Sequence, residues 1–283
     1  MNREEEAILV TGTSSGIGRS TALHLDGLGF RVFAGVRKEK DGQALRQAGS
    51  DRLTPLHLDV TDLDSVVSAV GVVQEETKGP LHALVNNAGV SLNGPLELVP
   101  LADIRTLMEV NVLGLLSVTK ALLPQLIQAR GHLINISSGH GLLAIPDKSV
   151  YAASKSAVEA ISDAMRVELR PFGVSVSSII VGKVNTEVLG KIEAARATML
   201  ADADPEAAGR YAPLLEFFDR EVKKLPGIAP EEVARVVAEA LLDRRPKARY
   251  LVGPGARKMR NLARLPQRLR DGLLYKAIYG SKP

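Results

Sequence analysis

The sequence predicts an α/β fold with one doubly wound parallel sheet of about seven strands and helices on both faces. Short apolar runs alternate with longer segments whose apolar residues recur at helical spacing, which is typical of βαβ units. A glycine-rich turn directly follows the first apolar run and opens a helical segment. The chain has 283 residues, of which 45% are hydrophobic, so it can bury this sheet in a single domain, residues 1–283.

Composition excludes several classes of chemistry. The chain has no cysteine, so it has neither disulfides nor thiolate nucleophiles, and its five histidines show no metal-ligand spacing, so no metal is predicted. Residues 1–6 are polar and do not resemble a secretory signal, and no apolar run long enough to span a membrane is expected. We therefore expect a cytoplasmic protein. The net charge of +4 suits phosphate-bearing ligands or an anionic surface.

The first predicted strand is residues 7–10 and the first predicted helix is residues 19–28. Between them lies the loop Thr11-Gly12-Thr13-Ser14-Ser15-Gly16-Ile17-Gly18. Glycines allow a tight turn and let the backbone approach a pyrophosphate, which binds at a helix N-terminus. The loop is not a Walker A motif, because no Gly-Lys-Ser/Thr follows. A phosphate-binding loop is the favoured interpretation, and a plain turn is the alternative.

The second predicted strand, residues 31–36, ends where a nucleotide-binding unit meets the adenosine ribose. An acidic residue there would bind the ribose hydroxyls of NAD, but the sequence has Val36, Arg37 and Lys38. Cations suit a 2′-phosphate, so NADP(H) is predicted as the preferred cofactor and NAD is the alternative. Both cations could instead be solvated turn charges.

Two more strands follow, residues 53–60 ending in Asp59 and Val60, and residues 81–85, with a predicted helix over 62–78 between them. Asn86-Asn87-Ala88-Gly89 directly follows the second of these strands. Small residues at this place let the backbone approach a flat ring, although the same residues also signal a plain turn.

Residues 101–130 are predicted as one helical region that carries Asn111 among apolar neighbours. A buried amide needs hydrogen-bond partners, so Asn111 is either a structural tie or the holder of a water. The fifth strand, residues 132–138, ends on Ser137 and Ser138. Ligands bind at this carboxyl edge in open α/β sheets.

Tyr151 and Lys155 lie four residues apart on the next predicted helix, which runs to about residue 170. This spacing places a phenol and an ammonium on one helix face. A neighbouring cation favours the ionised phenol, so the pKa of Tyr151 is expected to fall and the residue to exchange protons. A surface pair is the alternative.

The rest of the chain adds a strand over 174–181, an insert over about 187–228, a helix over 230–244 and a strand over 249–252. The insert is either a lid over a site or a surface excursion. The tail, about 255–283, mixes basic residues with leucines, so it is predicted as a basic amphipathic helix. It docks on its own domain or a partner subunit, and contact with a membrane surface is the less favoured alternative.

Together these motifs resemble the short-chain dehydrogenase/reductase family, in its Ser-Tyr-Lys branch, from about residue 7 to residue 252. The matching positions are Thr11, Gly12, Gly16, Gly18, Asp59, Asn86-Asn87-Ala88-Gly89, Asn111, Ser138, Tyr151 and Lys155. Ser138 precedes Tyr151 by the family's thirteen positions. One departure is Val181-Gly182, where the family usually has Pro-Gly, while Val184 and Thr186 still match the family's nicotinamide contacts.

The resemblance implies a Rossmann fold and a role for each matching residue. Tyr151 would exchange the proton with the substrate oxygen, Ser138 would hold that oxygen, and Lys155 would lower the pKa of Tyr151 and bind the nicotinamide ribose. Asn111 would position a water in a proton relay. Asp59 would lie near the adenine, and Asn87, Ala88 and Gly89 would line the cofactor.

The resemblance also implies an oxidoreductase that transfers a hydride between NADP(H) and a lipophilic ketone or secondary alcohol, such as a steroid, retinoid or other lipid-like carbonyl. His140, beside Ser138, either touches the substrate or is solvated. A homodimer or homotetramer is expected, and nucleic acid is not expected as a partner. The rival functions are a nicotinamide-binding regulatory module and a protein that docks on membranes or partners through its basic tail.

Overall fold

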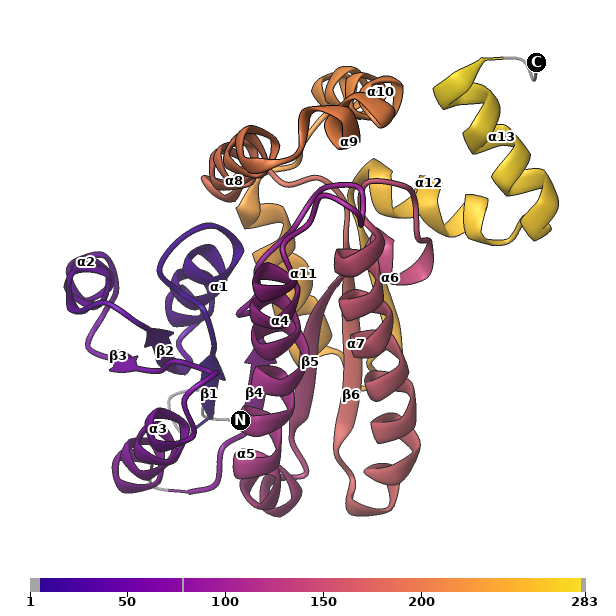
Figure 1. Cartoon of the computed structure of the whole chain (residues 1–283). Coiled ribbons are helices and arrows are strands. Elements are labelled where there is room, and N and C mark those ends of the chain that lie inside the picture. The colour runs from indigo at the N-terminus through magenta and orange to yellow at the C-terminus, as the bar shows by residue number, and fades with distance from the viewer. Residues whose placement is uncertain (1–5, 78, 281–283) are drawn as a thin grey trace.

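The computed structural model describes residues 6–77 and 79–280, and Figure 1 shows a central sheet with helices on both faces. The seven strands are parallel and lie in the order β3-β2-β1-β4-β5-β6-β7. They are β1 (Ala7–Val10), β2 (Arg31–Val36), β3 (Leu53–His57), β4 (Ala83–Asn86), β5 (His132–Ser138), β6 (Ser175–Val181) and β7 (Arg249–Val252). The order reverses between β1 and β4, which is where open α/β sheets bind ligands. The predicted doubly wound sheet is confirmed.

Two hydrophobic cores lie on opposite faces of the sheet. Helices α1 (Gly16–Gly27), α2 (Glu39–Ala48) and α11 (Pro230–Leu242) cover one face, and α3 (Leu63–Glu76), α5 (Leu115–Ala129) and α7 (Ser149–Glu168) cover the other. Strand β1 contributes side chains to both cores, because successive side chains of a strand point to opposite faces. Ile8 and Val10 pack in the first core, and Ala7 and Leu9 pack in the second.

Some element boundaries differ from the sequence predictions. The sequence does not predict α2, because its only large buried side chain is Leu45 and most of its other residues are polar. The third strand, predicted to reach Val60, ends at His57, and the chain turns where Thr61 donates to the Asp59 carboxylate over 3.0 Å. Helix α3 ends at Glu76, and Lys78 lies outside the described residues.

The predicted helical region over 101–130 consists of α4 (Leu101–Met108), the π-helical turn η2 (Glu109–Gly114) and α5. By length and composition it could cross a membrane, with a mean hydropathy of 1.5 over its most apolar window, although the sequence predicts no such segment. Half of that window is buried inside the fold. Packing on the sheet therefore explains its apolar residues.

The insert lies above the edge at which the strands end, as Figure 1 shows. It consists of α8 (Val188–Asp202), α9 (Pro205–Arg210) and α10 (Ala212–Lys224). A parallel bridge between Val184 and Ile228 closes its base. Two short elements flank α7, namely α6 (Gly139–Leu142) before it and the 3-10 turn η3 (Arg170–Phe172) after it.

The tail forms two helices rather than one, α12 (Gly253–Ala263) and α13 (Gln267–Tyr279), and residues 281–283 lie outside the described chain. The break falls at Pro266, which precedes α13. Helix α12 packs on α6, where Met259 lies against Gly139. Helix α13 contacts α10 but leaves the side chain of Leu269 about half exposed.

Candidate functional site at the carboxyl edge of the sheet

The glycine-rich loop after β1 is fixed to the loop after β4. The Asn87 side-chain amide donates to the carbonyl oxygens of Thr11 and Gly12, both over 2.9 Å. In return, the Thr11 hydroxyl accepts from the backbone N–H groups of Asn87 and Ala88 over 3.0 and 2.9 Å. Two motifs that lie 75 residues apart in the sequence thus form one surface at the switch point.

Glycine is required in this loop because the backbone packs too closely for a side chain. Gly12 has φ +68°, and a Cβ there would lie 2.7 Å from the Ala88 Cα. A Cβ on Gly18 would lie 2.2 Å from the Gly12 carbonyl oxygen, and one on Gly16 would lie 3.0 Å from Thr186. Helix α1 begins at Gly16, so its free N–H groups meet the loop and fit a pyrophosphate.

The other residues of the loop have different surroundings. Ser14 is exposed, Ser15 precedes α1 without a side-chain capping bond, and Ile17 packs against the first core. Val184, predicted near the cofactor together with Thr186, has its side chain buried in that same core. The structure thus places Thr186 beside the loop but turns the Val184 side chain away from solvent.

Arg37 and Asp59 lie near each other beyond the ends of β2 and β3. Burial alone would raise the pKa of Asp59, but hydrogen bonds from Thr61 and the positive charge of Arg37 lower it. Arg37 is exposed, so its guanidinium is open to a ligand. The side chain of Val60 instead lies against η2, where a Cβ on Gly114 would be 2.6 Å from it.

Asn111 is a structural tie between η2, the loop after β4, and α7. Its Oδ1 accepts from the Val90 N–H over 2.8 Å, and its Nδ2 donates to the Val90 carbonyl and the Ser154 hydroxyl over 2.9 and 3.0 Å. Both side-chain N–H groups are therefore used inside the protein. A water can reach only the remaining lone pair of Oδ1 or the backbone of the π turn.

Tyr151, Ser138 and His140 converge at the end of β5. The Ser138 side chain acts on the Tyr151 hydroxyl and lowers its pKa against the larger effect of burial, and the Tyr151 ring meets the His140 ring edge-on at 5.8 Å. Burial lowers the pKa of His140 to about 4, so this imidazole is neutral at physiological pH. His140 Nδ1 is buried and has no partner among the described residues, which argues against a solvated loop histidine.

Lys155 lies one turn after Tyr151 in α7, as predicted, but its ammonium makes its hydrogen bond to β5 and not to the Tyr151 hydroxyl. Its Nζ donates to the Ile136 carbonyl over 3.0 Å, beside Gly89. Burial raises the pKa of Tyr151, and Lys155 has no resolved effect on it. The expected lowering of the Tyr151 pKa by Lys155 is therefore wrong for this structure, because the ammonium is committed to a backbone carbonyl and the phenol is desolvated.

The insert is held over this edge by polar and apolar contacts. Arg196 of α8 pairs over 3.0 Å with Asp147, whose side chain is almost fully buried in the loop before α7. Burial raises the pKa of Asp147 against the effects of Arg196 and Lys148. Met199 packs with Leu98 in a separate small core. These contacts place the insert against the loop before α7 and the segment before α4.

Three residues around the site were not predicted from the sequence, namely Thr13, Asp147 and Glu159. Thr13 anchors the glycine loop by donating to the Gly35 carbonyl over 2.9 Å. Glu159 is a buried carboxylate one turn after Lys155, and that spacing was the available sequence signal. Within residues 6–77 and 79–280, no group of three or more His, Asp or Glu is arranged to hold a metal ion.

Comparison with known families gives a match to the short chain dehydrogenase model over residues 6–197. Among curated proteins, the chain is 35% identical over 279 residues to the NADPH-dependent 3-dehydrocapnine reductase of Ornithobacterium rhinotracheale, which covers 95% of this chain and 96% of that protein. It is 36% identical over 284 residues to human retinol dehydrogenase 16, which covers 96% and 88%.

Among solved structures, the fold is similar to that of an actinorhodin polyketide ketoreductase with NADPH. The TM-score is 0.75 at 28% identity, and the match covers 90% of this chain and 98% of that one.

Proposed function

The chain belongs to the short-chain dehydrogenase family and is an oxidoreductase of alcohols and ketones, and we propose its cofactor and substrate class. In this proposal it transfers a hydride between NADP(H) and a lipophilic ketone or secondary alcohol. The observation that carries the proposal is that Ser138 at the end of β5 acts on the Tyr151 hydroxyl of α7, with Lys155 one turn away, at the edge that also carries the glycine loop. A relative named as an NADPH-dependent reductase and another named as a retinol dehydrogenase support the cofactor and the lipophilic substrate.

The bound nicotinamide cofactor would supply the hydride. The N–H groups at the start of α1 would hold its pyrophosphate, and Arg37 would pair with the 2′-phosphate. Asp59 would face the adenine. Asn87, Ala88, Gly89, Val184 and Thr186 would line the rest of the cofactor. Lys155 would donate to the nicotinamide ribose.

Two hydroxyls act on the substrate oxygen in this proposal. In the reduction direction, negative charge develops on the carbonyl oxygen, and Ser138 donates a hydrogen bond to it. Tyr151 transfers its proton to the same oxygen. Because burial raises the pKa of Tyr151, its phenol stays protonated at neutral pH, which suits a proton donor. Lys155 acts through the cofactor ribose in this proposal, and Asn111 ties η2 to α7, the helix that carries Tyr151 and Lys155.

The reaction is tested by the loss of reduced-nicotinamide absorbance with NADPH and NADH against a panel of lipophilic ketones and aldehydes. Tyr151→Phe is expected to abolish turnover and to keep cofactor binding, because only the exchangeable proton is lost. Tyr250→Phe is the matched control, since Tyr250 is a buried tyrosine of β7 outside the site. A Tyr151→Phe enzyme that retains more than a small fraction of activity contradicts the proton-transfer role. Tight cofactor binding without turnover across a broad panel favours a regulatory module.

The cofactor preference is tested by reversing the charge at Arg37. Arg37→Asp is expected to move the ratio of kcat/KM values toward NADH, because the 2′-phosphate loses its cation. Arg46→Asp is the control, since Arg46 is an exposed arginine of α2 that pairs with Glu39. Equal effects of the two substitutions on the ratio would refute the assignment of Arg37.

The organisation of the protein belongs to the same proposal. We propose one domain whose insert closes over the substrate, in a homodimer or homotetramer that uses the helices around Asn111 and Tyr151. Leu101, Leu113 and Leu116 are exposed there, which supports burial against a second copy. Sedimentation at several concentrations tests this, and a monomer at all of them contradicts it.

A cytoplasmic location is the favoured proposal, with peripheral membrane contact as the second candidate. Leu269, Leu273, Tyr275 and Tyr279 are about half exposed on α13, and the helix also carries several cations. Salt-sensitive binding to anionic vesicles that disappears when residues 255–283 are deleted would favour the second candidate. Absence of binding would leave the cytoplasmic proposal in place.

A further inference from the structure

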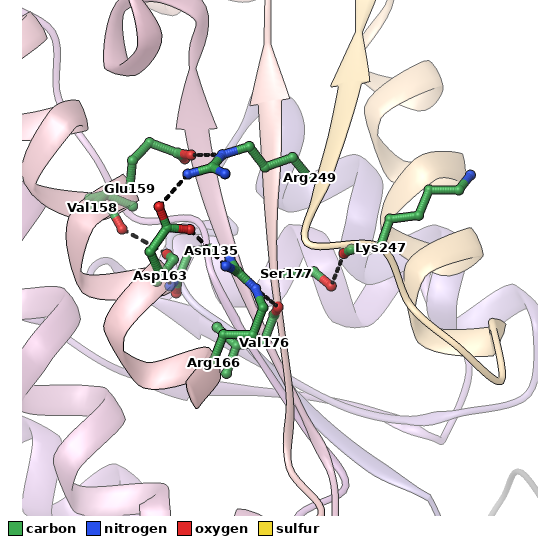
Figure 2. Close-up of polar contacts among 10 residues, drawn as sticks. Asn135, Val158, Glu159, Asp163, Arg166, Val176, Ser177, Lys247 and Arg249 are labelled. Carbon is green, nitrogen blue, oxygen red and sulfur yellow. Dashed lines mark hydrogen bonds and ion pairs between the residues drawn. The ribbon is translucent and has the colours of Figure 1, made fainter. Parts of the chain in front are cut away.

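A buried carboxylate lies one helical turn beyond Lys155. Glu159 is only 5% exposed, and its Oε2 accepts a hydrogen bond over 2.6 Å from Nε of Arg249. Figure 2 shows Arg249 reaching from β7 to α7 to make this contact. Its other oxygen, Oε1, is buried without a hydrogen-bond partner among the described residues. Burying a carboxylate with one oxygen unpaired costs free energy of folding, so we expect this carboxylate to serve a function.

The arginine that holds Glu159 is itself fixed by a second, more exposed carboxylate. Arg249 Nη2 donates to Asp163 over 2.6 Å, and Asp163 also accepts from Arg166 over 2.7 Å. Arg166 Nε donates to the Val176 carbonyl of β6 over 3.1 Å, and Figure 2 shows this chain of contacts. The network thus joins α7, β6 and β7 and fixes the Glu159 carboxylate from one side.

Lys155 is a buried cation four residues before Glu159 on α7, a spacing that places both side chains on one face of the helix. It is 6% exposed, and its Nζ donates to a neutral acceptor, the Ile136 carbonyl. Burial lowers the pKa of Lys155 to about 8, and the negative charge of Glu159 opposes that shift. The ammonium therefore depends on Glu159 for its counter-charge, because a carbonyl dipole only partly replaces water.

The neighbouring elements bring no competing charge to Lys155. In α7 the other titratable neighbour is Tyr151, which burial keeps neutral. His140 of α6 is neutral at physiological pH, and η2 contributes the uncharged Asn111, while its Glu109 is exposed. Strands β5 and β6 contribute backbone carbonyls and hydroxyls, and the charged residues of α4 and η3 are exposed. Glu159 is thus the charge that acts on Lys155 within the described residues.

We propose that Glu159, clamped by Arg249, is a positioning residue that keeps the Lys155 ammonium charged and in place for the reaction. This inference rests on the proposed function, in which the Lys155 ammonium holds the cofactor ribose. Arg249 orients the carboxylate and prevents it from leaving the helix face. The last strand of the sheet thereby contributes to the site through Arg249.

The charge is tested by Glu159→Gln, which keeps the size of the side chain, against Asp163→Asn as a matched control. Both substitutions remove a carboxylate from the same arginine, but Asp163 is two turns from Lys155 and half exposed. For reduction, activity requires the ammonium and is lost as pH rises through the pKa of Lys155. We expect Glu159→Gln to move that loss about one unit toward acid, because the opposing charge is gone. At pH 8 kcat/KM then falls roughly fivefold, while at pH 6 it hardly changes.

Asp163→Asn is expected to leave the pH profile unchanged. A uniform loss of activity at all pH values in Glu159→Gln, or an equal shift in both variants, overturns the inference, because a merely structural pair would behave in that way. Thermal unfolding at pH 6 checks that both variants are folded under the assay conditions.

A second measurement does not depend on turnover. The ¹³Cε resonance of Lys155, assigned by its loss in Lys155→Met, reports the ammonium titration of the full chain directly. The Lys155 midpoint should fall by about one unit in Glu159→Gln and stay fixed in Asp163→Asn. If the wild-type chain reduces no ketone yet shows this shift, the proposed function fails and the pairing stands. If the wild-type chain reduces ketones and the Lys155 midpoint does not move in Glu159→Gln, the pairing of Lys155 with Glu159 is wrong and the proposed function stands.

Discussion

Replacing Gly18 by alanine tests the packing between the glycine loop and the loop after β4. The new methyl group would lie 2.2 Å from the Gly12 carbonyl oxygen and 2.4 Å from Asn87 Nδ2. Relief requires movement of backbone or loss of the Asn87 hydrogen bonds to Thr11 and Gly12. Overpacking of this kind costs about 3 kcal/mol, and the better helix propensity of alanine offsets about 1 kcal/mol.

The net destabilisation of about 2 kcal/mol corresponds to a fall in Tm of roughly 3 °C for a chain of this size. Because the displaced atoms form the proposed phosphate cradle, NADPH binding, followed by fluorescence, should weaken by about tenfold or more. The control is Gly27→Ala at the end of the same helix, where a Cβ meets no atom within 4 Å. A Gly18→Ala protein with wild-type Tm and wild-type NADPH affinity would refute this description of the loop.

Two other predictions concern the walls of the site. His140 has a folded-state pKa of about 4, below the ordinary 6.5. Between these two pH values the unfolded chain binds more protons than the folded chain, so the free energy of unfolding falls as pH drops through this window, by up to about 3 kcal/mol. His140→Phe should therefore lose less Tm than the wild type between pH 7 and pH 4.5, and equal losses would contradict the neutral buried imidazole. Arg196→Met leaves Asp147 buried without its ion pair and should cost about 3 kcal/mol, seen as a lower Tm that the further change Asp147→Asn partly restores. Arg220→Met, at an exposed arginine of α10, should leave Tm unchanged.

The alternation of strands and helices follows from local signals, and for this reason the doubly wound parallel sheet was predicted correctly. Short apolar runs such as residues 7–10 and 132–138 stand out from the amphipathic helices between them. The polar helix α2 lacks such a signal, since Leu45 alone anchors it in the core among the larger side chains. The tail was predicted as one helix because its composition is uniform, and only Pro266 marks the break.

The site was harder to predict than the fold, because the pKa values of its residues depend on which atoms the charged ends of long side chains contact. The spacing of Tyr151 and Lys155 correctly places both on α7, but spacing does not reveal that the ammonium binds the Ile136 carbonyl. The direction of the Tyr151 pKa shift therefore came out wrong. Likewise Glu159 is visible one turn after Lys155, whereas its partner Arg249 lies 90 residues further along the chain.

The bridge between Val184 and Ile228 holds the two ends of the insert together, so the insert is attached to the domain as one separate segment. Asn185 donates to the Ile228 carbonyl over 2.9 Å, and Ile228 donates to the Lys183 carbonyl over 3.0 Å, so both ends of the segment are pinned at one neck below α8–α10. Loop length adds little to the entropy of closing such a neck. Segments of different length and polarity can therefore be grafted between these two positions without disturbing the pairing of β6 with β7.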